Sequence, residues 1–345
     1  MPDRDQAVQA FLAAHGWRPQ HRSRLADDAS FRSYDRLRDG QRRAVLMNAP
    51  PPQEDVRPFI QIANHLRGLG LSAPEIYAED CDQGFLLLED LGDATYTRVL
   101  KSTPAREPAL YQLAVDVLVY LHKLPSAQLL PDGLAVFTTE RLLAEVNLLI
   151  AWFVPQLSGA PLPPEAIVSY QALWRELFDF VQHQPQCLIL RDFHVDNLLW
   201  LEGRTGLKSC GLLDFQDALV GATAYDLMSL LEDARRDIPD AVAGPLKQRY
   251  FAAFDDLANP GPARQAFEAT YAILGAGRHA KVIGIFTRLC LRDGKADYLT
   301  HIPRVWRLLE SSLRHPMLAA LADWFDTYLP HSLRTAPAWP ADEDR

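Results

Sequence analysis

The sequence predicts an α+β protein: a small antiparallel sheet with one main helix, followed by a larger, mostly helical part. The pair Asp39-Gly40 separates two strand-like stretches, 31–38 and 41–47, and is a strong signal for a two-residue hairpin. From Glu107 onward, apolar residues recur at the three- and four-residue spacing of helices. A length of 345 residues suits one two-lobed domain or two small ones.

Two helices and two further strands complete the smaller part. Residues 4–15 form a short apolar face that indicates a helix. Residues 56–69 are the main helix, because Phe59 and the apolar residues after it fall on one face. The stretches 76–78 and 85–88 are expected to be strands, since both are short, apolar and separated by a polar turn.

The larger part is predicted from its helical periodicity. Between its helices, the loop 155–164 is rich in proline and carries no charge. Thr139 is expected to cap the helix that follows it. The expected helices are 110–121, 139–153, 165–181, 224–236, 267–274, 279–291, 305–313 and 318–328.

Composition excludes several classes of protein. The net charge of −9 disfavours general binding to nucleic acid or to an anionic membrane. The sequence has no apolar run long enough to span a bilayer, and its first residues lack the pattern of a signal peptide. The four cysteines are scattered, which favours reduced thiols in a cytoplasmic protein over a zinc site or disulfides.

Two short apolar stretches each lead into an aspartate. Residues 188–190 precede Asp192, and residues 212–213 precede Asp214. Asn197 follows Asp192 at the spacing D-x-x-x-x-N, which is the interval of catalytic loops that transfer phosphoryl groups. Such transfer needs one carboxylate to accept a hydroxyl proton and oxygen ligands to hold Mg²⁺ on the phosphates. Asp192, Asn197 and Asp214 fit those three roles in that order.

The context of this loop favours the functional interpretation. A second apolar run, 198–201, follows Asn197, so we expect 188–190 and 198–201 to pair as a hairpin. The simpler alternative is that Asp192 and Asn197 only cap turns, as these residue types often do. His194 lies inside the same loop and competes with Asp192 as the base.

The motifs LRDFHVDNLL (190–199) and LLDFQDAL (212–219) resemble those of the aminoglycoside phosphotransferase superfamily of small-molecule kinases. More narrowly, the chain is similar to bacterial anomeric kinases of cell-wall amino sugars. The stretches that carry this narrower similarity are DASFRSY (28–34), AVLMNAPP (44–51), FLLLEDLGD (85–93), YDLMSLLEDARRD (225–237) and IGIFTRLCLRDGK (283–295). The resemblance implies a bilobal, protein-kinase-like fold, with a nucleotide-binding lobe at 1–90 and a catalytic, substrate-binding helical lobe at 91–345.

The resemblance also implies how ATP is held. The backbone of Glu89 and Leu91 would bind the adenine edge. The turn containing Ser30 stands where kinases carry a glycine-rich phosphate loop; the simpler alternative is an ordinary polar turn. Motif alignment puts Met47 and Phe59 at the positions of the usual lysine and glutamate, and the first lysine in the chain is Lys101.

Another cation must therefore face the phosphates. Arg32 is favoured over Arg42 and Arg43 because it follows the turn at Ser30, and arginine can bind phosphate bidentately. The competing interpretation is that these arginines only cover solvated faces of strands.

The expected acceptor is the anomeric hydroxyl of N-acetylmuramate or N-acetylglucosamine, in the recycling of peptidoglycan sugars. Asp196 and Arg278 are the candidate substrate contacts, and Arg278 would face the lactyl carboxylate of muramate. Two alternatives remain: a related kinase acting on an aminoglycoside, a choline-like alcohol or an amino acid, and a nucleotide-binding regulator without catalysis. We expect the protein to act as a cytoplasmic monomer.

Overall fold

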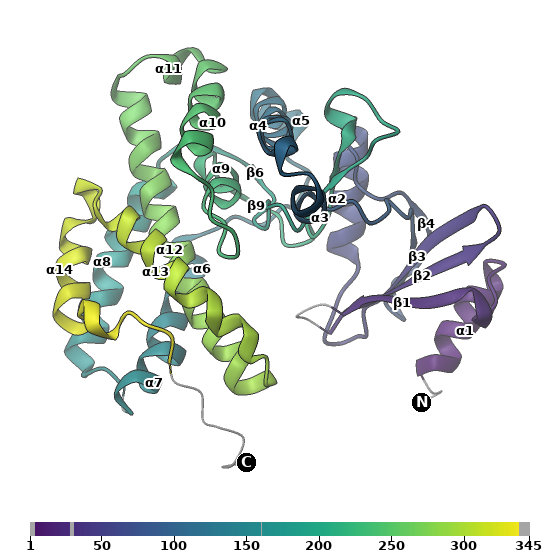
Figure 1. The fold of residues 1–345 in the computed structure, drawn as a ribbon, viewed down its shortest axis with the longest axis horizontal. Coiled ribbons are helices and arrows are strands. Elements are labelled where there is room, and N and C mark those ends of the chain that lie inside the picture. Colours follow the sequence, from purple (N-terminus) through teal and green to yellow (C-terminus); the bar gives the residue numbers. More distant parts are fainter. Residues whose placement is uncertain (1–3, 28–30, 160, 338–345) are drawn as a thin grey trace. The chain divides into compact units, whose positions relative to one another are not determined.

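The computed structural model describes residues 4–27, 31–159 and 161–337, and has the predicted α+β class (Figure 1). The chain divides into two compact units. The first unit is Met1–Gly133 with Leu190–Ala218, and the second unit is Leu134–Ile189 with Leu219–Arg345. The division into a nucleotide-binding lobe at 1–90 and a catalytic lobe at 91–345 stays a prediction.

The first unit contains an antiparallel sheet of five strands in the order β1-β2-β3-β5-β4. The strands are β1 Arg22–Asp27, β2 Ser33–Asp39, β3 Arg42–Asn48, β4 Ile76–Asp80 and β5 Phe85–Leu88. The hairpin predicted at Asp39-Gly40 is confirmed, because β2 and β3 pair directly across it. Strand β1 was not predicted, since its sequence RSRLAD lacks the apolar alternation that marks a half-buried strand.

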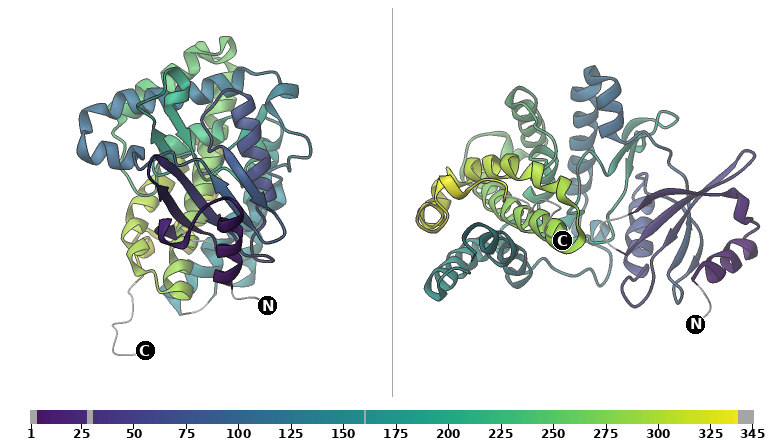
Figure 2. Two further views of the ribbon diagram at one scale, coloured as in Figure 1. Left: turned by 90° about the vertical axis from the view of Figure 1, so that its right-hand side faces the viewer. Right: turned by 60° about the horizontal axis from the view of Figure 1, so that its bottom comes forward.

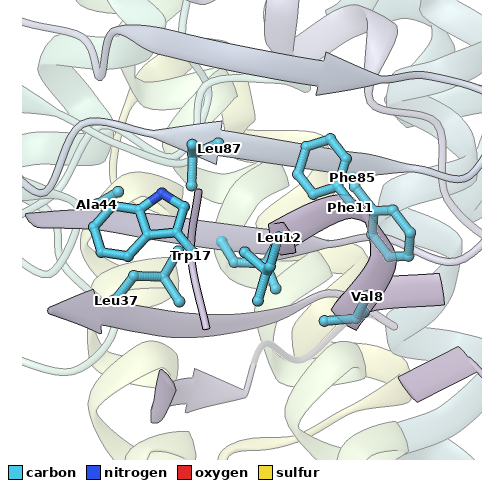
Figure 3. Packing of buried hydrophobic residues seen from close by; sticks show 9 residues of the cluster. Val8, Phe11, Leu12, Trp17, Leu37, Ala44, Phe85 and Leu87 are labelled. Carbon is cyan, nitrogen blue, oxygen red and sulfur yellow. The ribbon is translucent and has the colours of Figure 1, made fainter. Parts of the chain in front are cut away.

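Alternation along the strands gives the sheet two different faces. On one face, side chains from β2, β3 and β5 pack against α1 (Arg4–Ala14) (Figure 3). Figure 2 shows α1 and this sheet in two further views. This apolar cluster consists of Val8, Phe11, Leu12, Trp17, Leu37, Ala44, Leu46, Phe85 and Leu87. Successive side chains of a strand point to opposite faces, so the neighbours Tyr34, Arg36, Val45 and Leu88 point the other way, where the candidate site lies.

The first unit contains the predicted main helix and the helix expected at 110–121, which lies within α4 (Glu107–Lys123), whereas the helices at Tyr96–Ser102 and Ser126–Leu129 were not predicted. The predicted main helix is α2 (Arg57–Gly68), which buries Phe59, Ile62, Ala63 and Leu66. The others are α3 Tyr96–Ser102, α4 Glu107–Lys123 and α5 Ser126–Leu129, and short 3₁₀ turns lie at Pro19–His21, Pro104–Arg106 and Gly206–Ser209.

The strand pairing around residues 186–222 differs from the prediction. Strand β7 (Leu198–Trp200) pairs with β8 (Cys210–Leu212), and β6 (Gln186–Ile189) pairs with β9 (Leu219–Ala222). The predicted hairpin between 188–190 and 198–201 is therefore wrong. Arg191 has a left-handed backbone (φ 67°) that redirects the chain out of β6, so the loop after it is held by other bonds.

The second unit is mainly helical around α12, the longest helix in Figure 1. Helices α6, α9 and α13 pack against α12. The helices are α6 Thr139–Leu148, a π-helical turn Leu149–Phe153, α7 Val154–Ser158, α8 Pro164–Gln182, α9 Ala224–Leu231, α10 Asp240–Ala252, α11 Asp255–Ala258, α12 Pro262–Asp293, α13 Ile302–Leu313 and α14 Ala319–Tyr328, with 3₁₀ turns at Ala296–His301, Pro316–Leu318 and His331–Leu333.

Four predictions about this unit are corrected, concerning helices, one loop and one helix cap. The helices expected at 267–274 and 279–291 are one helix, α12, because its glycines lie against neighbouring groups and do not interrupt it. The proline-rich loop 155–164 begins as α7, since a proline is tolerated in the first turn of a helix. The helix expected at 224–236 ends at Leu231. Thr138 caps α6 in place of Thr139, accepting from Arg141 N at 3.4 Å.

No helix in the described ranges combines the length and apolarity needed to cross a membrane. All four cysteines are free thiols, and three of them are buried.

Candidate functional site

Two residues in the first unit have strained backbones. Arg191 (φ 67°) and Asp214 (φ 57°) are the non-glycine residues with positive φ in the described part of the chain. The left-handed backbone conformation costs a residue with a side chain about 1–3 kcal/mol, and residues in this conformation cluster at functional sites. The two positions adjoin the two motifs that the sequence singled out.

Asn197 joins these two motifs. Its amide nitrogen donates to the backbone carbonyl of Asp192 at 2.9 Å and to Oδ2 of Asp214 at 3.2 Å. The same nitrogen lies 3.4 Å from Nε2 of His194. The backbone carbonyl of Asn197 accepts from Leu213 N at 2.9 Å, which places the strand before Asp214 beside the loop. With its nitrogen engaged, the amide oxygen of Asn197 is left to face a ligand.

The Asp214 carboxylate is surrounded by donors. Gln216 donates from Nε2 to Oδ1 at 2.8 Å, and Arg32 places Nη2 3.4 Å from the same oxygen. The Arg32 side chain is 11% exposed, so it is held at the site and does not extend into solvent. Arg32 thus lies beside the predicted metal ligand, which the interpretation as a solvated strand residue does not explain.

The Asp192 loop is fixed through its backbone. Asp192 N donates to the carbonyl of Leu190 at 2.8 Å, and the Asp192 carbonyl also accepts from His194 N at 3.2 Å. His194 is 7% exposed and its ring lies against Asn197. Asp192 is only partly buried. Asp192 is therefore more accessible than His194 in this loop.

A cavity of about 360 Å³ adjoins these residues within the first unit. This volume lies in the range of small-molecule sites. Its walls are largely apolar, and Asn197 and Asp214 form part of its lining. The apolar lining residues are Leu25, Val45, Phe59, Leu88, Leu199 and Leu213. Flat apolar walls of this kind suit a planar ring with polar edges.

Residues 89–92 form one edge of the cavity, where the sequence predicts contacts to adenine. The backbone N–H of Glu89 already donates to the carbonyl of Glu75 at 2.7 Å. The Glu89 carboxylate pairs with Arg204 and lies 3.7 Å from Arg67. The carbonyl of Glu89 and the N–H of Leu91 therefore remain as the acceptor and donor that this edge can present.

Arg36 fixes that edge, and sequence reasoning missed it. Its guanidinium pairs with Asp90 (2.9 Å), donates to Asp93 (2.7 Å) and reaches the carbonyl of Gly92 (3.3 Å). Burial opposes charge on Arg36, but the hydrogen bonds and charges of Asp93 and Asp90 outweigh it and raise its pKa. The alternating pattern of β2, which directs Arg36 to the same face as Tyr34, was the available signal.

An aromatic stack stands where kinases form an ion pair. The rings of Phe59 on α2 and Phe215 lie 5.0 Å apart at 29°. Met47, at the usual lysine position, is 1% exposed in the sheet. Phe215 directly follows Asp214, so this apolar contact connects α2 to the predicted metal ligand.

Three further residues were predicted to belong to the site: Asp196, Arg278 and Ser30. Asp196 accepts a hydrogen bond from the hydroxyl of Thr97 on α3. Arg278 belongs to the second unit, where its Nη1 lies 3.3 Å from the hydroxyl of Tyr225. Ser30 lies outside the described residues. The roles given to these three residues stay predictions.

The donor set near Asn197 and Asp214 fits Mg²⁺. An amide oxygen and a carboxylate are hard ligands, and Mg²⁺ usually binds one or two protein groups with phosphate and water completing its shell. No group of three His, Cys, Asp or Glu side chains that could hold a metal occurs among the described residues.

Comparison with known proteins gives consistent results. The model of the phosphotransferase enzyme family matches residues 21–264. A protein of Caulobacter vibrioides named N-acetylmuramate/N-acetylglucosamine kinase is 34% identical, with 96% of this chain and 98% of the relative covered. A protein of the same name from Pseudomonas aeruginosa is 36% identical, with coverage of 92% and 93%. The choline kinase structure from Streptococcus pneumoniae has a TM-score of 0.61 at 12% identity, covering 89% of this chain and 99% of that one, and supports the fold alone.

The Arg36 cluster yields a matched pair of variants. Asp90 is 4% exposed at its side chain and accepts from Arg36 and Gly92 N, whereas Asp93 is 48% exposed. Asp90→Asn should lower the free energy of unfolding at pH 7 by about 3 kcal/mol, because it breaks a buried pair. Asp93→Asn should cost less than about 1 kcal/mol, because solvent screens that pair. Urea denaturation measures both.

The stabilisation that Asp93 contributes should decrease as the pH falls. The hydrogen bond from Arg36 lowers the pKa of Asp93 below its ordinary value. Its stabilisation is thus present above about pH 4 and is lost as the pH falls through the lowered pKa. Equal costs for the two variants at pH 7 would contradict the assignment of Asp90 as the buried partner.

Proposed function

Because the chain belongs to the phosphotransferase enzyme family, we propose that it transfers the γ-phosphoryl group of ATP to the anomeric hydroxyl of an amino sugar. The match to the phosphotransferase enzyme family confirms the family resemblance that the two motifs predicted. The acceptor is inferred from the name shared by the two relatives, which align with more than nine-tenths of this chain. The observation that carries the chemistry is the Asn197 amide, which joins the Asp192 loop to the Asp214 carboxylate.

In this proposal Asp192 accepts the proton of the attacking hydroxyl. An anomeric hydroxyl is more acidic than an ordinary alcohol, so the carboxylate has mainly to orient the oxygen and to stabilise the departing proton. Two features support this role: the backbone bonds that fix the loop, and the partial exposure of Asp192. His194 stays with Asn197 and supports the loop.

Asn197 and Asp214 would hold Mg²⁺ through the amide oxygen and the carboxylate. When bound, the metal neutralises charge on the phosphates. Asn197 keeps the Asp214 carboxylate turned toward the cavity, and Gln216 holds its other oxygen at 2.8 Å. The left-handed backbone of Asp214 is consistent with a residue constrained for function.

The adenine would lie between the apolar walls of the cavity. The carbonyl of Glu89 would accept from its amino group and the N–H of Leu91 would donate to its ring nitrogen. Arg32 would take the place of the missing lysine, since its guanidinium is already within 3.4 Å of Asp214. Ser30 is proposed beside the phosphates from the sequence alone.

The acceptor contacts rest on the sequence and on chemistry. Asp196 and Arg278 remain the proposed contacts, with Arg278 as the cation for a muramate carboxylate. We further infer that the protein works in the cytoplasm as a monomer, where ATP is present and thiols stay reduced. A place in the recycling of peptidoglycan sugars follows from the proposed acceptor.

A product assay tests the proposed reaction. The protein is incubated with Mg·ATP and, separately, N-acetylmuramate, N-acetylglucosamine, the methyl glycoside of N-acetylglucosamine, an aminoglycoside and choline. Mass spectrometry and ³¹P NMR should detect an acid-labile sugar phosphate from the two free sugars. The methyl glycoside should give none, because its anomeric oxygen is blocked. Phosphorylation of the methyl glycoside, or of the aminoglycoside or choline alone, would overturn the proposed acceptor.

The base is tested by a conservative change. Asp192→Asn removes the proton acceptor but keeps size and shape, so kcat should fall at least about 100-fold. ATP affinity, measured by calorimetry, should change little because the nucleotide contacts remain. Asp323→Asn makes the same chemical change at an exposed position on α14, and its turnover should stay near wild type. Undiminished turnover of Asp192→Asn would remove Asp192 from this role.

A further inference from the structure

A second cavity lies wholly within the second unit, among α9, α10, α12 and the end of α13 (Figure 1). It encloses about 480 Å³, which is enough for a small organic molecule. It shares no lining residue with the nucleotide cavity. The proposed kinase reaction therefore assigns it no role.

Lys247 on α10 is the central charge of this cavity. Its ammonium nitrogen lies 3.7 Å from the centre of the Tyr271 ring on α12. Lys247 is only partly exposed, and burial lowers its pKa, although the charges of Glu232, Glu268 and Asp240 act in the opposite direction. No carboxylate in the described residues forms an ion pair with it.

The carboxylates that line the cavity are already engaged. Glu232 lies 2.7 Å from Nε2 of His279. Glu268 pairs with Arg264 at 3.1 Å, one helical turn away on α12. Arg264 and His279 do not themselves line the cavity. The two acidic groups therefore have partners outside it, whereas no described carboxylate forms an ion pair with Lys247.

The other polar groups of the lining are mainly donors. Tyr271 is 7% exposed, and burial followed by the charge of Glu232 raises its pKa, so its hydroxyl stays protonated. That hydroxyl faces the Glu232 carboxylate, to which it donates a hydrogen bond that also raises its pKa. His315 accepts from Met317 N at 3.3 Å through Nδ1, which leaves its Nε2–H as a donor. Arg314 adds a further cation. These groups call for an acceptor-rich anion.

The apolar part of the lining suits a ring. Phe251 and Phe267 have ring centres 5.4 Å apart at 87°, so one offers an edge where the other offers a face. The small residues Gly244 and Ala272 complete the walls, and a side chain added at Gly244 would meet no atom within 4 Å. Aromatic walls beside a few polar groups are typical of small-molecule sites.

From this arrangement we infer that the cavity binds a small ring-bearing organic anion, a carboxylate or a phosphate ester. Its charged group would lie against Lys247, and its ring would pack against Phe251 and Phe267. The inference does not depend on the kinase reaction, and it would stand if the proposed acceptor were wrong.

Direct binding tests the ligand class. Calorimetry is run on the full chain with benzoate, phenyl phosphate, inorganic phosphate and benzyl alcohol as separate probes. Phenyl phosphate or benzoate should bind at one site. Inorganic phosphate lacks the ring and benzyl alcohol lacks the charge, so each should bind at least tenfold more weakly. If neither ring-bearing anion binds at millimolar concentration, or if benzyl alcohol binds as well as they do, the inference is wrong.

Variants place the bound probe. Lys247→Met removes the central charge and should weaken binding at least tenfold. Ala272→Leu fills the cavity without touching any charge and should abolish binding. Lys295→Met removes the same charge from an exposed position outside the cavity and should bind like the wild type. Unchanged binding in both cavity variants would mean that the probe sits elsewhere.

A chemical label on the wild-type chain keeps the test decisive if a cavity variant fails to fold. Pyridoxal phosphate carries a ring, a phosphate and an aldehyde. The deprotonated fraction of the Lys247 amine, which a lowered pKa increases, would add to the aldehyde with loss of water, and borohydride would reduce the imine to a stable secondary amine. Peptide mapping should show Lys247 labelled ahead of Lys295, with phenyl phosphate protecting Lys247. Equal labelling of the two lysines, or no protection, would overturn the inference.

Discussion

The amide of Asn197 is the interaction on which the candidate site depends. Its single nitrogen donates hydrogen bonds both to the carbonyl of Asp192 and to the Asp214 carboxylate. Two loops from separate stretches of sequence thereby take one arrangement, although no ladder of strand hydrogen bonds connects Asp192 to Asn197. A fixed arrangement matters because phosphoryl transfer depends on position and charge more than on covalent chemistry. The strained backbones of Arg191 and Asp214 are consistent with that demand.

The nucleotide side of the site is organised without a lysine. An aromatic stack between Phe59 and Phe215 connects α2 to the Asp214 loop. Arg32, close to Asp214, is the cation available for phosphates, and Arg36 stabilises the edge expected to bind adenine. One lysine in kinases both fixes a helix and meets phosphate. In the proposed site these two functions would be divided between the Phe59–Phe215 contact and Arg32.

The parts of the fold with regular periodicity were predictable from sequence. The β2–β3 hairpin and helix α2 follow from Asp39-Gly40 and from one apolar face, because these signals are local. The pairing of β6 with β9 was not predictable, since it depends on a turn at Arg191 that a non-glycine residue rarely makes. The motif predicted Asp192, Asn197 and Asp214 as site residues, and in the structure Asn197 bonds to both aspartates. The motif could not give Arg36, whose role depends on contacts formed only in the folded chain.

Substitution of a metal-binding carboxylate by a thiol tests the central claim most directly. Cysteine is a soft ligand that favours Cd²⁺ over Mg²⁺. If Asp214 holds the metal, Asp214→Cys should lose activity with Mg²⁺ and regain part of it with Cd²⁺, while the wild type keeps its preference for Mg²⁺. An Asp214→Cys enzyme that turned over with Mg²⁺ as fast as the wild type would contradict the account.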